Sequence, residues 1–563
     1  MAAAASCRVA VVGAGAAGLA AARELAREGH APVVFEQGRE AAGVWVYSPA
    51  ADADPLGSDA ASGRRAHGSL YAGLRTNLPR EIMSFTEYPF TPGAMAAAGQ
   101  PSGDGRRFPG HGEVLAYLRA YAEHYGLHKF VRYGARVVRA KPLGRAGGGA
   151  AAAAAAAEAA AEAEAAEAEA PGDAPVTGDS GPRWEVTFEV EDPATGARDT
   201  QRQEFDALVV CNGHYTATNL PRVEGREEFP GLQMHSHNYR TPEPFAGQTV
   251  LIVGASNSGE DLCREIATAA ARVILCARSW KNTAWADDGG APFGPRANIE
   301  RRGMVLRLRR DGGAEFEAGA AVGGVDAVVY ATGYRYEFPF LDDSTVEPDG
   351  GGGGGGDGGG GDGEGEGVGT RAGGEGAAGR GGAAAAARLS LRDQHVWPLW
   401  QHMFFPPLAP TLAFIGLPWK WCPFSQFELQ SRLVARTLSG RAPPLPSRAR
   451  MAAEVDAASR RLAALGRPPR WFHMLGDDQW AYADWLLDAA GSEGPRCAPW
   501  RAAMYKHTGE SKRAHPEDYR DRWGDAAAAA EAAGELAGWE AAVLREAAAR
   551  GGSGAAAAAA AAH

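Results

Sequence analysis

One pattern occurs twice in this chain: an apolar run that ends at a glycine-rich turn, then a stretch of helical composition, then a second apolar run. In the first copy these parts span 7–13, 19–28 and 31–36. In the second copy they span 248–254, 258–271 and 272–278. A strand, helix and strand joined in this way form a nucleotide-binding unit, because the turn brings a phosphate to the N-terminus of the helix. The chain is therefore predicted to hold two nucleotides.

Each unit has a later partner strand, at 207–213 for the first and at 326–333 for the second. The second unit therefore lies between two pieces of the first. This order predicts an α/β fold with two dinucleotide-binding, Rossmann-like domains, the second inserted into the larger first. The expected limits are 7–221 and 336–520 for the first domain and 222–335 for the second, with crossings near Pro221 and Pro339.

Three stretches, 143–182, 349–388 and 525–563, consist almost entirely of Ala, Gly and acidic residues. Without them the chain is long enough for two or three domains. The Ala/Glu part at 150–170 has the composition of an exposed helix. A glycine-rich run such as 350–361 loses too much backbone entropy on ordering, so it is expected to be a mobile surface loop. The Ala-rich tail is expected to be disordered or helical.

Charge and cysteine content argue against several classes of protein. The chain has 57 Lys and Arg against 68 Asp and Glu, a net charge of −11, so nucleic acid is not an expected partner. Its 6 cysteines are scattered, which argues against a disulfide framework, a metal site and a redox-active dithiol. No apolar run reaches the roughly 18 residues of a membrane span, and no targeting segment is recognisable. We expect a cytoplasmic protein without a membrane anchor.

In the first turn, Gly13-Ala-Gly15-Ala16-Ala-Gly18, each glycine has a separate task. Gly13 permits the tight turn, Gly15 lets the backbone approach a pyrophosphate, and Gly18 allows the helix to pack closely on the strand. Glu36, at the end of the second strand, is placed to accept hydrogen bonds from ribose hydroxyls. The alternatives are a purely structural glycine turn and a solvated acid at a strand end.

The second turn keeps the outer glycines, Gly254 and Gly259, and has Ser256 in the middle. Serine is the smallest replacement that still lets a phosphate approach. The strand that follows ends at Arg278 instead of an acid. A guanidinium binds a 2′-phosphate bidentately whereas a carboxylate would repel it, so this site is predicted to prefer NADP over NAD. The alternative for Arg278 is an ordinary surface arginine.

Between the two units, the segment from Phe229 through Gly231 and His235 to Tyr239 matches the pattern FxGxxxHxxxY. Taken alone, His235 is consistent with a hydrogen-bonded core histidine. In combination with the two glycine turns the pattern becomes specific. The chain resembles the flavin-containing monooxygenases, class B flavoprotein oxygenases that carry this fingerprint between an FAD site and an NADPH site.

Three further segments are similar to the family's segments: one that passes the flavin, one in the active site, and one glycine turn. They are Gly43-Val-Trp45, Leu74-Arg-Thr76-Asn77 and Ala331-Thr332-Gly333-Tyr334. The part from 396 to 430 is most similar to the plant branch, whose known members S-oxygenate thioethers. Within it, Ser425 and Glu428 form an S-x-x-E pattern, which predicts a helix that starts there and directs its positive end at the flavin.

The resemblance implies that NADPH reduces FAD, that O2 adds at the flavin C4a as a hydroperoxide, and that a soft nucleophile takes one oxygen atom. The implied cofactors are FAD and NADPH, and the partners are O2 and a small-molecule thioether or amine. Asn77 is the implied catalytic residue, and His235 and Tyr239 are expected to organise the domain junction and the retained NADP+. The expected cofactor-binding residues are Gly13, Gly15, Ala16, Gly18, Glu36, Gly43, Trp45, Thr76, Asn77, His235, Tyr239, Gly254, Ser256, Asn257, Ser258, Gly259, Arg278, Thr332 and Gly333.

Other functions share parts of this pattern. A Baeyer–Villiger oxygenase has the same fold, but Arg240 follows Tyr239 where that family's fingerprint usually continues with Pro or Asp. A disulfide reductase would need a closely spaced cysteine pair. An NADPH oxidase that releases H2O2 and a non-catalytic FAD-binding interaction protein also stay open.

Overall fold

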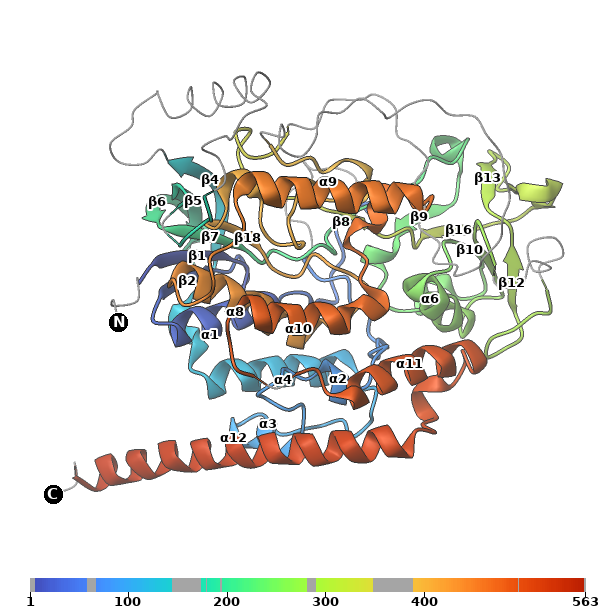
Figure 1. Ribbon diagram of the computed structural model, residues 1–563. Helices are drawn as coiled ribbons and strands as arrows, with labels where there is room; N and C mark the ends of the chain where they lie inside the picture. The colour runs from blue at the N-terminus through green and yellow to red at the C-terminus, as the bar shows by residue number, and fades with distance from the viewer. Residues whose placement is uncertain are drawn as a thin grey trace, which may run out of the picture.

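The computed structural model describes residues 6–57, 67–143, 174–178, 180–192, 195–280, 290–347, 388–494 and 496–560. Its centre consists of two sheets of five parallel strands (Figure 1). The first has the order β18-β7-β1-β2-β3, with bounds Leu412–Phe414, Ala207–Val210, Arg8–Val12, Ala31–Phe35 and Val131–Arg132. The second has the order β12-β11-β10-β16-β9, with bounds Ile299–Arg302, Arg272–Cys276, Thr249–Val253, Ala327–Tyr330 and Leu232–His235.

The two sheets repeat one design. β1 pairs with β2 on one side and with β7 on the other, and β10 pairs in the same way with β11 and β16. Every strand of the second sheet comes after β7 and before β18 in the chain. The α/β fold with one Rossmann-like domain inserted into another is therefore confirmed. We propose 222–335 as the limits of the inserted domain, with 7–221 and 336–520 as the two parts of the first.

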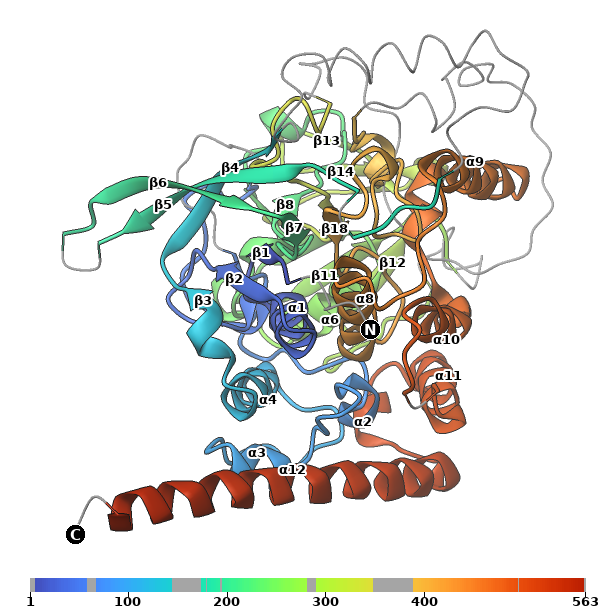
Figure 2. The same ribbon diagram turned by 60° about the vertical axis from the view of Figure 1, so that its left-hand side comes forward.

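Each parallel sheet has two buried faces, because successive residues of a strand point to opposite sides. In β1, Val9 and Val11 face a layer of helices, whereas Ala10 and Val12 face an antiparallel sheet. That sheet has the order β4-β5-β6, with bounds Ala135–Leu143, Arg183–Glu191 and Arg198–Phe205 (Figure 2). The first domain is thus built from three layers.

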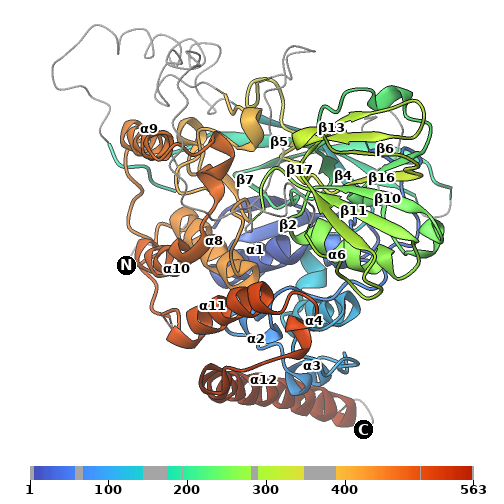
Figure 3. The ribbon, with the colours of Figure 1, turned by 90° about the vertical axis from the view of Figure 1, so that its right-hand side faces the viewer.

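The inserted domain has the same three layers. Val250 and Ile252 of β10 face α6 (Asn257–Ala267), and Leu251 and Val253 face a second antiparallel sheet. It has the order β13-β14-β15, with bounds Val305–Leu308, Ala314–Phe316 and Ala321–Val322 (Figure 3). The repeat seen in the sequence therefore extends to a whole three-layered domain.

The two connections between the domains lie beside each other. β8 (Ala217–Thr218) pairs antiparallel with β17 (Tyr334–Arg335), and the Asn219 N–H donates to the Gly333 carbonyl at 3.0 Å. Pro221 and Pro339, the expected crossings, each follow one strand of this ribbon. The chain therefore leaves and re-enters the first domain at one place.

Most helices of the first domain lie below its sheet in Figure 1, whereas α9 lies above it, and α12 runs beneath the lower helices beside α3. Their bounds are Ala16–Arg27 (α1), Arg80–Met83 (α2), Pro92–Ala97 (α3), His111–His124 (α4), Pro423–Leu438 (α8), Arg448–Ala464 (α9), Gln479–Ala489 (α10), Pro499–Ala514 (α11) and Ala526–Ala560 (α12). The Ala-rich tail is thus helical, one of its two expected states. The expected helix at 150–170 and the loop at 350–361 lie outside the described residues. In the part of the chain that is described, no helix combines the length and the apolar character needed to cross a membrane.

α1 and α8 lie side by side and run in the same direction. Arg23 of α1 contacts Glu428 of α8 at 2.8 Å, and further along both helices Glu28 contacts Arg436 at 3.2 Å. α1 follows β1, and α8 follows β18 of the same parallel sheet. The N-termini of both helices therefore lie at the carboxyl edge of the sheet, where parallel α/β folds bind their ligands.

A buried cluster of five charged side chains joins these helices. Besides the Arg23–Glu428 pair, Arg432 contacts Glu24 at 2.9 Å, and Glu87 contacts both arginines. None of the five is more than 17% exposed. Burial raises the pKa of Glu428 to about 7. Burial also acts to raise the pKa of Glu87, but the neighbouring guanidinium groups outweigh it and lower that pKa to about 2.

The predicted start of α8 is wrong. The helix begins at Pro423 with Cys422 as its N-cap residue, so Ser425 lies inside the first turn and caps nothing. Proline is favourable at the first helical position because its missing N–H would have no helical partner. Glu428 cannot complete a capping box, because its carboxylate binds Arg23 and accepts the Thr86 N–H at 2.6 Å. Smaller differences are that α1 begins at 16 instead of 19 and α6 ends at 267 instead of 271.

Replacement of Arg23 by Ala should destabilise the first domain strongly. Glu428 and Glu87 would lose a cation inside the protein, and breaking a buried pair costs about 3–5 kcal/mol. The control is Arg450→Ala, which removes an ion pair whose arginine side chain is 70% exposed and should cost below about 0.5 kcal/mol. Thermal unfolding of both variants is the measurement. Equal, small shifts in Tm would contradict the assigned role of the cluster.

Candidate dinucleotide and active site

The first glycine turn is shaped by two close approaches of the backbone. Gly13 has φ +99°, and a Cβ atom there would lie 2.6 Å from the Cys211 carbonyl oxygen. A Cβ atom on Gly18 would lie 1.8 Å from the Gly13 carbonyl oxygen. Neither position accepts a side chain, because real Cβ atoms do not come within 3.0 Å of such atoms. The tight turn and the close packing of α1 on β1 are therefore both present.

The second turn reproduces this geometry. Gly254 has φ +105°, and a Cβ atom there would lie 2.5 Å from the Ala331 carbonyl oxygen. A Cβ atom on Gly259 would lie 1.8 Å from the Gly254 carbonyl oxygen. The agreement with the first turn shows that the serine in the middle leaves the backbone of the motif unchanged.

The Glu36 carboxylate connects the first glycine turn to the loop that follows β2. Its carboxylate accepts the Ala14 N–H at 2.8 Å through one oxygen and the Gly38 N–H at 2.7 Å through the other. Each carboxylate oxygen has two lone pairs, so both can still accept a hydrogen bond from a ribose hydroxyl. The residue thus lies where the ribose role requires it, and that role stays a prediction.

The segment expected to pass the flavin crosses directly over the first turn. A Cβ atom on Gly43 would lie 2.9 Å from the Gly15 Cα. Trp45, at the end of the same 3-10 turn, packs edge-on against Phe424 in the first turn of α8, with ring centroids 6.4 Å apart. Gly15 is the N-cap residue of α1 and Ala16 its first residue. The N-termini of α1 and α8 are therefore near one another at this edge, and neither first turn carries an acid. Two positive helix ends without an acid suit an anionic ligand.

Thr76 and Asn77 differ sharply in exposure. Thr76 is 4% exposed, its N–H donates to the Pro109 carbonyl at 2.9 Å, and its side-chain hydroxyl has no hydrogen-bond partner among the described residues. Asn77 is exposed. An unpartnered buried hydroxyl and the glycine cradle are features that a bound cofactor would complete, so the residues present fit FAD.

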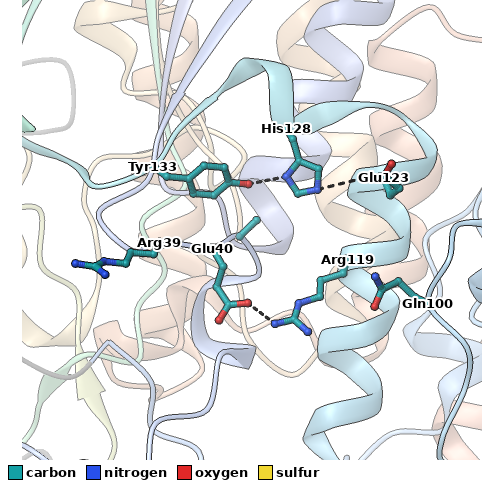
Figure 4. Close-up of a pocket in the computed structure, with 8 residues that line it drawn as sticks. Arg39, Glu40, Gln100, Arg119, Glu123, His128 and Tyr133 are labelled. Atoms are coloured by element: carbon teal, nitrogen blue, oxygen red, sulfur yellow. Dashed lines mark hydrogen bonds and ion pairs between the residues drawn. The ribbon is translucent and has the colours of Figure 1, made fainter. Parts of the chain in front are cut away.

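A polar pocket of about 290 Å³ lies on the outer side of the loop that follows Glu36 (Figure 4). Arg119 of α4 contacts Glu40 there, and His128 hydrogen-bonds with the Tyr133 hydroxyl at 2.7 Å. Neither Trp45 nor Asn77 is among the residues that line this pocket.

In the inserted domain, three predicted residues begin α6 or precede it. Ser256 is the N-cap residue, and Asn257 and Ser258 follow it. The Asn257 side-chain oxygen accepts a hydrogen bond from the Lys512 ammonium group at 2.5 Å. Arg278 is exposed two residues after the end of β11.

Thr332 and Gly333 follow β16 at the domain connection. The Thr332 hydroxyl donates to the Asn219 carbonyl, and the Asn219 side-chain amide donates back to the Thr332 carbonyl at 3.1 Å. Thr332 thus ties the two connections together. Gly333 has φ +79°, and a Cβ atom there would meet no atom within 4 Å, so this glycine borders open space.

The fingerprint residues His235 and Tyr239 are 0% and 1% exposed. The His235 ring accepts the His237 backbone N–H at 3.1 Å through Nδ1, and the His235 backbone N–H donates to the Pro55 carbonyl at 2.9 Å. Burial lowers the pKa of His235 to about 3. Tyr239 packs against Tyr71, with ring centroids 5.6 Å apart. Both side chains therefore lie in the core, and their expected roles in organising the domain junction and in contacting NADP+ stay predictions.

Arg240 is a residue whose importance sequence reasoning missed. It is 9% exposed, and its five N–H groups all find backbone carbonyls. The acceptors and their distances are Ser48 at 2.8 Å, Ala50 at 3.2 Å, Gly68 at 3.3 Å, His237 at 2.7 Å and Tyr239 at 2.9 Å. Arg240 therefore fixes the loop after Trp45 to the interdomain segment. The one signal in the sequence was that an arginine follows the fingerprint.

The family model for flavin-binding monooxygenase-like proteins matches residues 6–149, 172–293 and 297–349, more than half of the chain. The chain belongs to the flavin-binding monooxygenase-like family. It is a monooxygenase whose cofactors are FAD and NADPH, as the resemblance to this family implies. No group of three or more His, Cys, Asp or Glu side chains within the described ranges is arranged to hold a metal ion.

Two relatives from Arabidopsis thaliana show the same family over nearly the whole length. This monooxygenase is 35% identical to flavin-containing monooxygenase FMO GS-OX-like 4, over 92% of this chain and 94% of that protein. It is 37% identical to flavin-containing monooxygenase FMO GS-OX-like 2, over 92% of this chain and 91% of that protein.

Two solved structures share the fold. S-allyl-L-cysteine S-oxygenase from Allium sativum matches with a TM-score of 0.74 and 34% identity, over 95% of this chain and 99% of that chain. Tmm from Pelagibacter sp. strain HTCC7211 matches with a TM-score of 0.63 over 92% of this chain and 93% of that chain, and at 20% identity it supports the fold alone.

Replacement of Gly18 by alanine and of Gly259 by alanine should each disrupt a different nucleotide site. The added Cβ would lie 1.8 Å from a carbonyl oxygen in each turn. Gly18→Ala should purify without FAD, whereas Gly259→Ala should keep FAD and lose NADPH binding. Gly534→Ala in α12 is the control, since a Cβ there meets no atom within 4 Å. Visible absorption gives the FAD content and calorimetry the NADPH affinity. A Gly18→Ala protein with full FAD content would contradict the site assignment.

Proposed function

We propose that this monooxygenase transfers one oxygen atom of O2 to the sulfur of a small thioether. The balanced reaction is thioether + O2 + NADPH + H+ giving sulfoxide, water and NADP+. The observation that carries the proposal is the match to an S-oxygenase along 95% of the chain, with 34% identity. Amine nitrogen, the alternative acceptor, has no comparable observation in its favour.

The chain's own residues have distinct tasks in this proposal. Gly13, Gly15 and Gly18 let the FAD pyrophosphate reach the N-terminus of α1, and Glu36 holds the ribose. Bound FAD supplies electron transfer and the activation of O2. Trp45 and Phe424 shield the reacting region from water, because solvent access favours loss of the activated oxygen as H2O2. The oxygen-transfer route that the resemblance implies stays a prediction.

Asn77 is proposed as the catalytic residue, with its side-chain amide hydrogen-bonding the flavin or the bound oxygen. Its exposed side chain is carried on a backbone that is held firmly, since the Thr76 N–H donates to the Pro109 carbonyl. A donor fixed in this way needs no reorganisation during the reaction, which is why removing one typically costs about 10²–10³-fold in rate.

The direct test is the ratio of sulfoxide formed to NADPH consumed, measured on FAD-loaded protein with a methyl thioether while H2O2 is assayed. We expect a ratio near one for the wild type. Asn77→Ala should still consume NADPH but form at least tenfold less sulfoxide and correspondingly more H2O2. The control is Gln100→Ala, in the polar pocket of Figure 4, which should match the wild type. NADPH consumption by the wild type that yields only H2O2 would favour an oxidase, and oxygenation of an amine but not of the thioether would replace the proposed substrate class.

Arg278 is proposed to bind the 2′-phosphate of NADPH. Arg278→Ala should raise the KM for NADPH at least tenfold and leave the KM for NADH nearly unchanged, because only NADPH carries the phosphate. Arg309→Ala, at an exposed ion pair of the same domain, serves as the control. Equal losses for both nucleotides in Arg278→Ala would place recognition of the 2′-phosphate elsewhere.

A further inference from the structure

The two nucleotide-binding helices differ in charge next to their N-termini. α1 carries no acid in its first turn, whereas α6 has Glu260 in its first turn and Asp261 directly after it. A helix N-terminus attracts anions through its free N–H groups, and adjacent carboxylates oppose this attraction. The second site is therefore unfavourable for a pyrophosphate unless other residues neutralise the two acids.

The neutralising cations come from the end of the first domain. Lys512 of α11 contacts Glu260 at 3.3 Å, and Arg520 contacts Asp261 at 2.6 Å. Between them, Glu517 contacts Arg264 of α6 at 3.1 Å. This C-terminal segment, Lys512 to Arg520, therefore runs along α6, and Figure 3 shows α11 below α6 in the ribbon.

Arg520 also binds the segment that carries Asn77. Its Nε donates to the Thr76 carbonyl at 2.9 Å, while Nη2 of the same guanidinium donates to the Asp261 carboxylate at 2.6 Å. The Arg520 and Asp261 side chains are only 18% and 19% exposed, so solvent screens this pair weakly. The next residue, Asp521, pairs with Arg75 at 2.8 Å. One partly buried guanidinium thus joins the NADPH-side helix to the backbone beside Asn77.

The same carboxylate is linked to the fingerprint. The Tyr71 hydroxyl donates to Asp261 at 3.4 Å, and the Tyr71 ring packs on Tyr239. The Asp261 carboxylate therefore accepts hydrogen bonds from Arg520, at the end of the first domain, and from Tyr71, in the segment that leads to Asn77. A movement of α6 would therefore change the contacts of Asp261 with Arg520 and with Tyr71.

We propose that Arg520 is a positioning residue that couples occupancy of the NADPH site to the placement of Asn77. It neutralises Asp261 so that the N-terminus of α6 accepts a pyrophosphate, and it holds the Thr76 carbonyl so that Asn77 keeps its place. This inference rests on the proposed assignment of the two sites.

The test measures NADP+ affinity by calorimetry on FAD-loaded protein, together with FAD content and Tm. Arg520→Ala should weaken NADP+ binding about tenfold, within the usual range of coupling between sites, without loss of FAD. Arg520→Lys, which keeps the charge but not the two separate N–H donors of the guanidinium, should lose less NADP+ affinity. The control is Arg522→Ala on the same short segment, where the arginine side chain is 60% exposed. Unchanged NADP+ affinity in Arg520→Ala, or an equal loss in Arg522→Ala, would overturn the proposal.

The variant Asp261→Asn keeps the test valid if Arg520→Ala folds poorly. Asp261→Asn should bind NADP+ at least as tightly as the wild type, because an acid near the pyrophosphate is gone. In the Asp261→Asn background, Arg520→Ala should lose less than threefold in NADP+ affinity. A full tenfold loss in that background would show that Arg520 does not act through Asp261.

A second cycle tests the link to Asn77, using H2O2 released per NADPH consumed. Arg520→Ala should raise this ratio in the wild-type background and leave it unchanged in the Asn77→Ala background, because both act on one group. Equal increases in both backgrounds would contradict coupling through Asn77. If the wild type forms no sulfoxide while Arg520→Ala still weakens NADP+ binding, the proposed substrate is wrong and the neutralising role of Arg520 stands.

Discussion

The contact between a helix and a backbone carbonyl, at Gly18 and again at Gly259, is the constraint on which the rest of the structure depends. It lets each helix begin directly above the strand before it, so that unpaired N–H groups meet a phosphate at the carboxyl edge of the sheet. In the first domain, the buried ion pairs around Glu428 hold a second helix, α8, beside α1 and parallel to it. Two positive helix ends and Trp45 then surround one site.

Polar contacts connect the inserted domain to the first domain at several places. Arg240 satisfies all five of its N–H groups on backbone carbonyls from both sides of the junction. The β8–β17 ribbon brings both connections to one place. Lys512 and Arg520 supply charge to a helix that belongs to the other domain. Directional contacts of this kind fix an orientation while leaving the domains as separate units.

Much of the fold could be predicted because its signals are local. The glycine turns, the partner strands and the insertion all follow from short apolar runs read in order. The start of α8 was wrong because S-x-x-E is a weak signal, and the buried neighbours that occupy Glu428 are distant in sequence. Arg520 and Asp261 lie 259 residues apart, so no local pattern could pair them. The described residues leave the cytoplasmic location and the cofactor contacts as predictions.

The central claim is that one chain holds two different dinucleotides in two sites of the same design. The most direct test is the binding stoichiometry: FAD content from visible absorption, followed by calorimetric titration of the FAD-loaded protein with NADP+. The account predicts one FAD and one NADP+ per chain, with no release of FAD during the titration. Displacement of FAD by NADP+, or an FAD-loaded protein that does not bind NADP+, would contradict it.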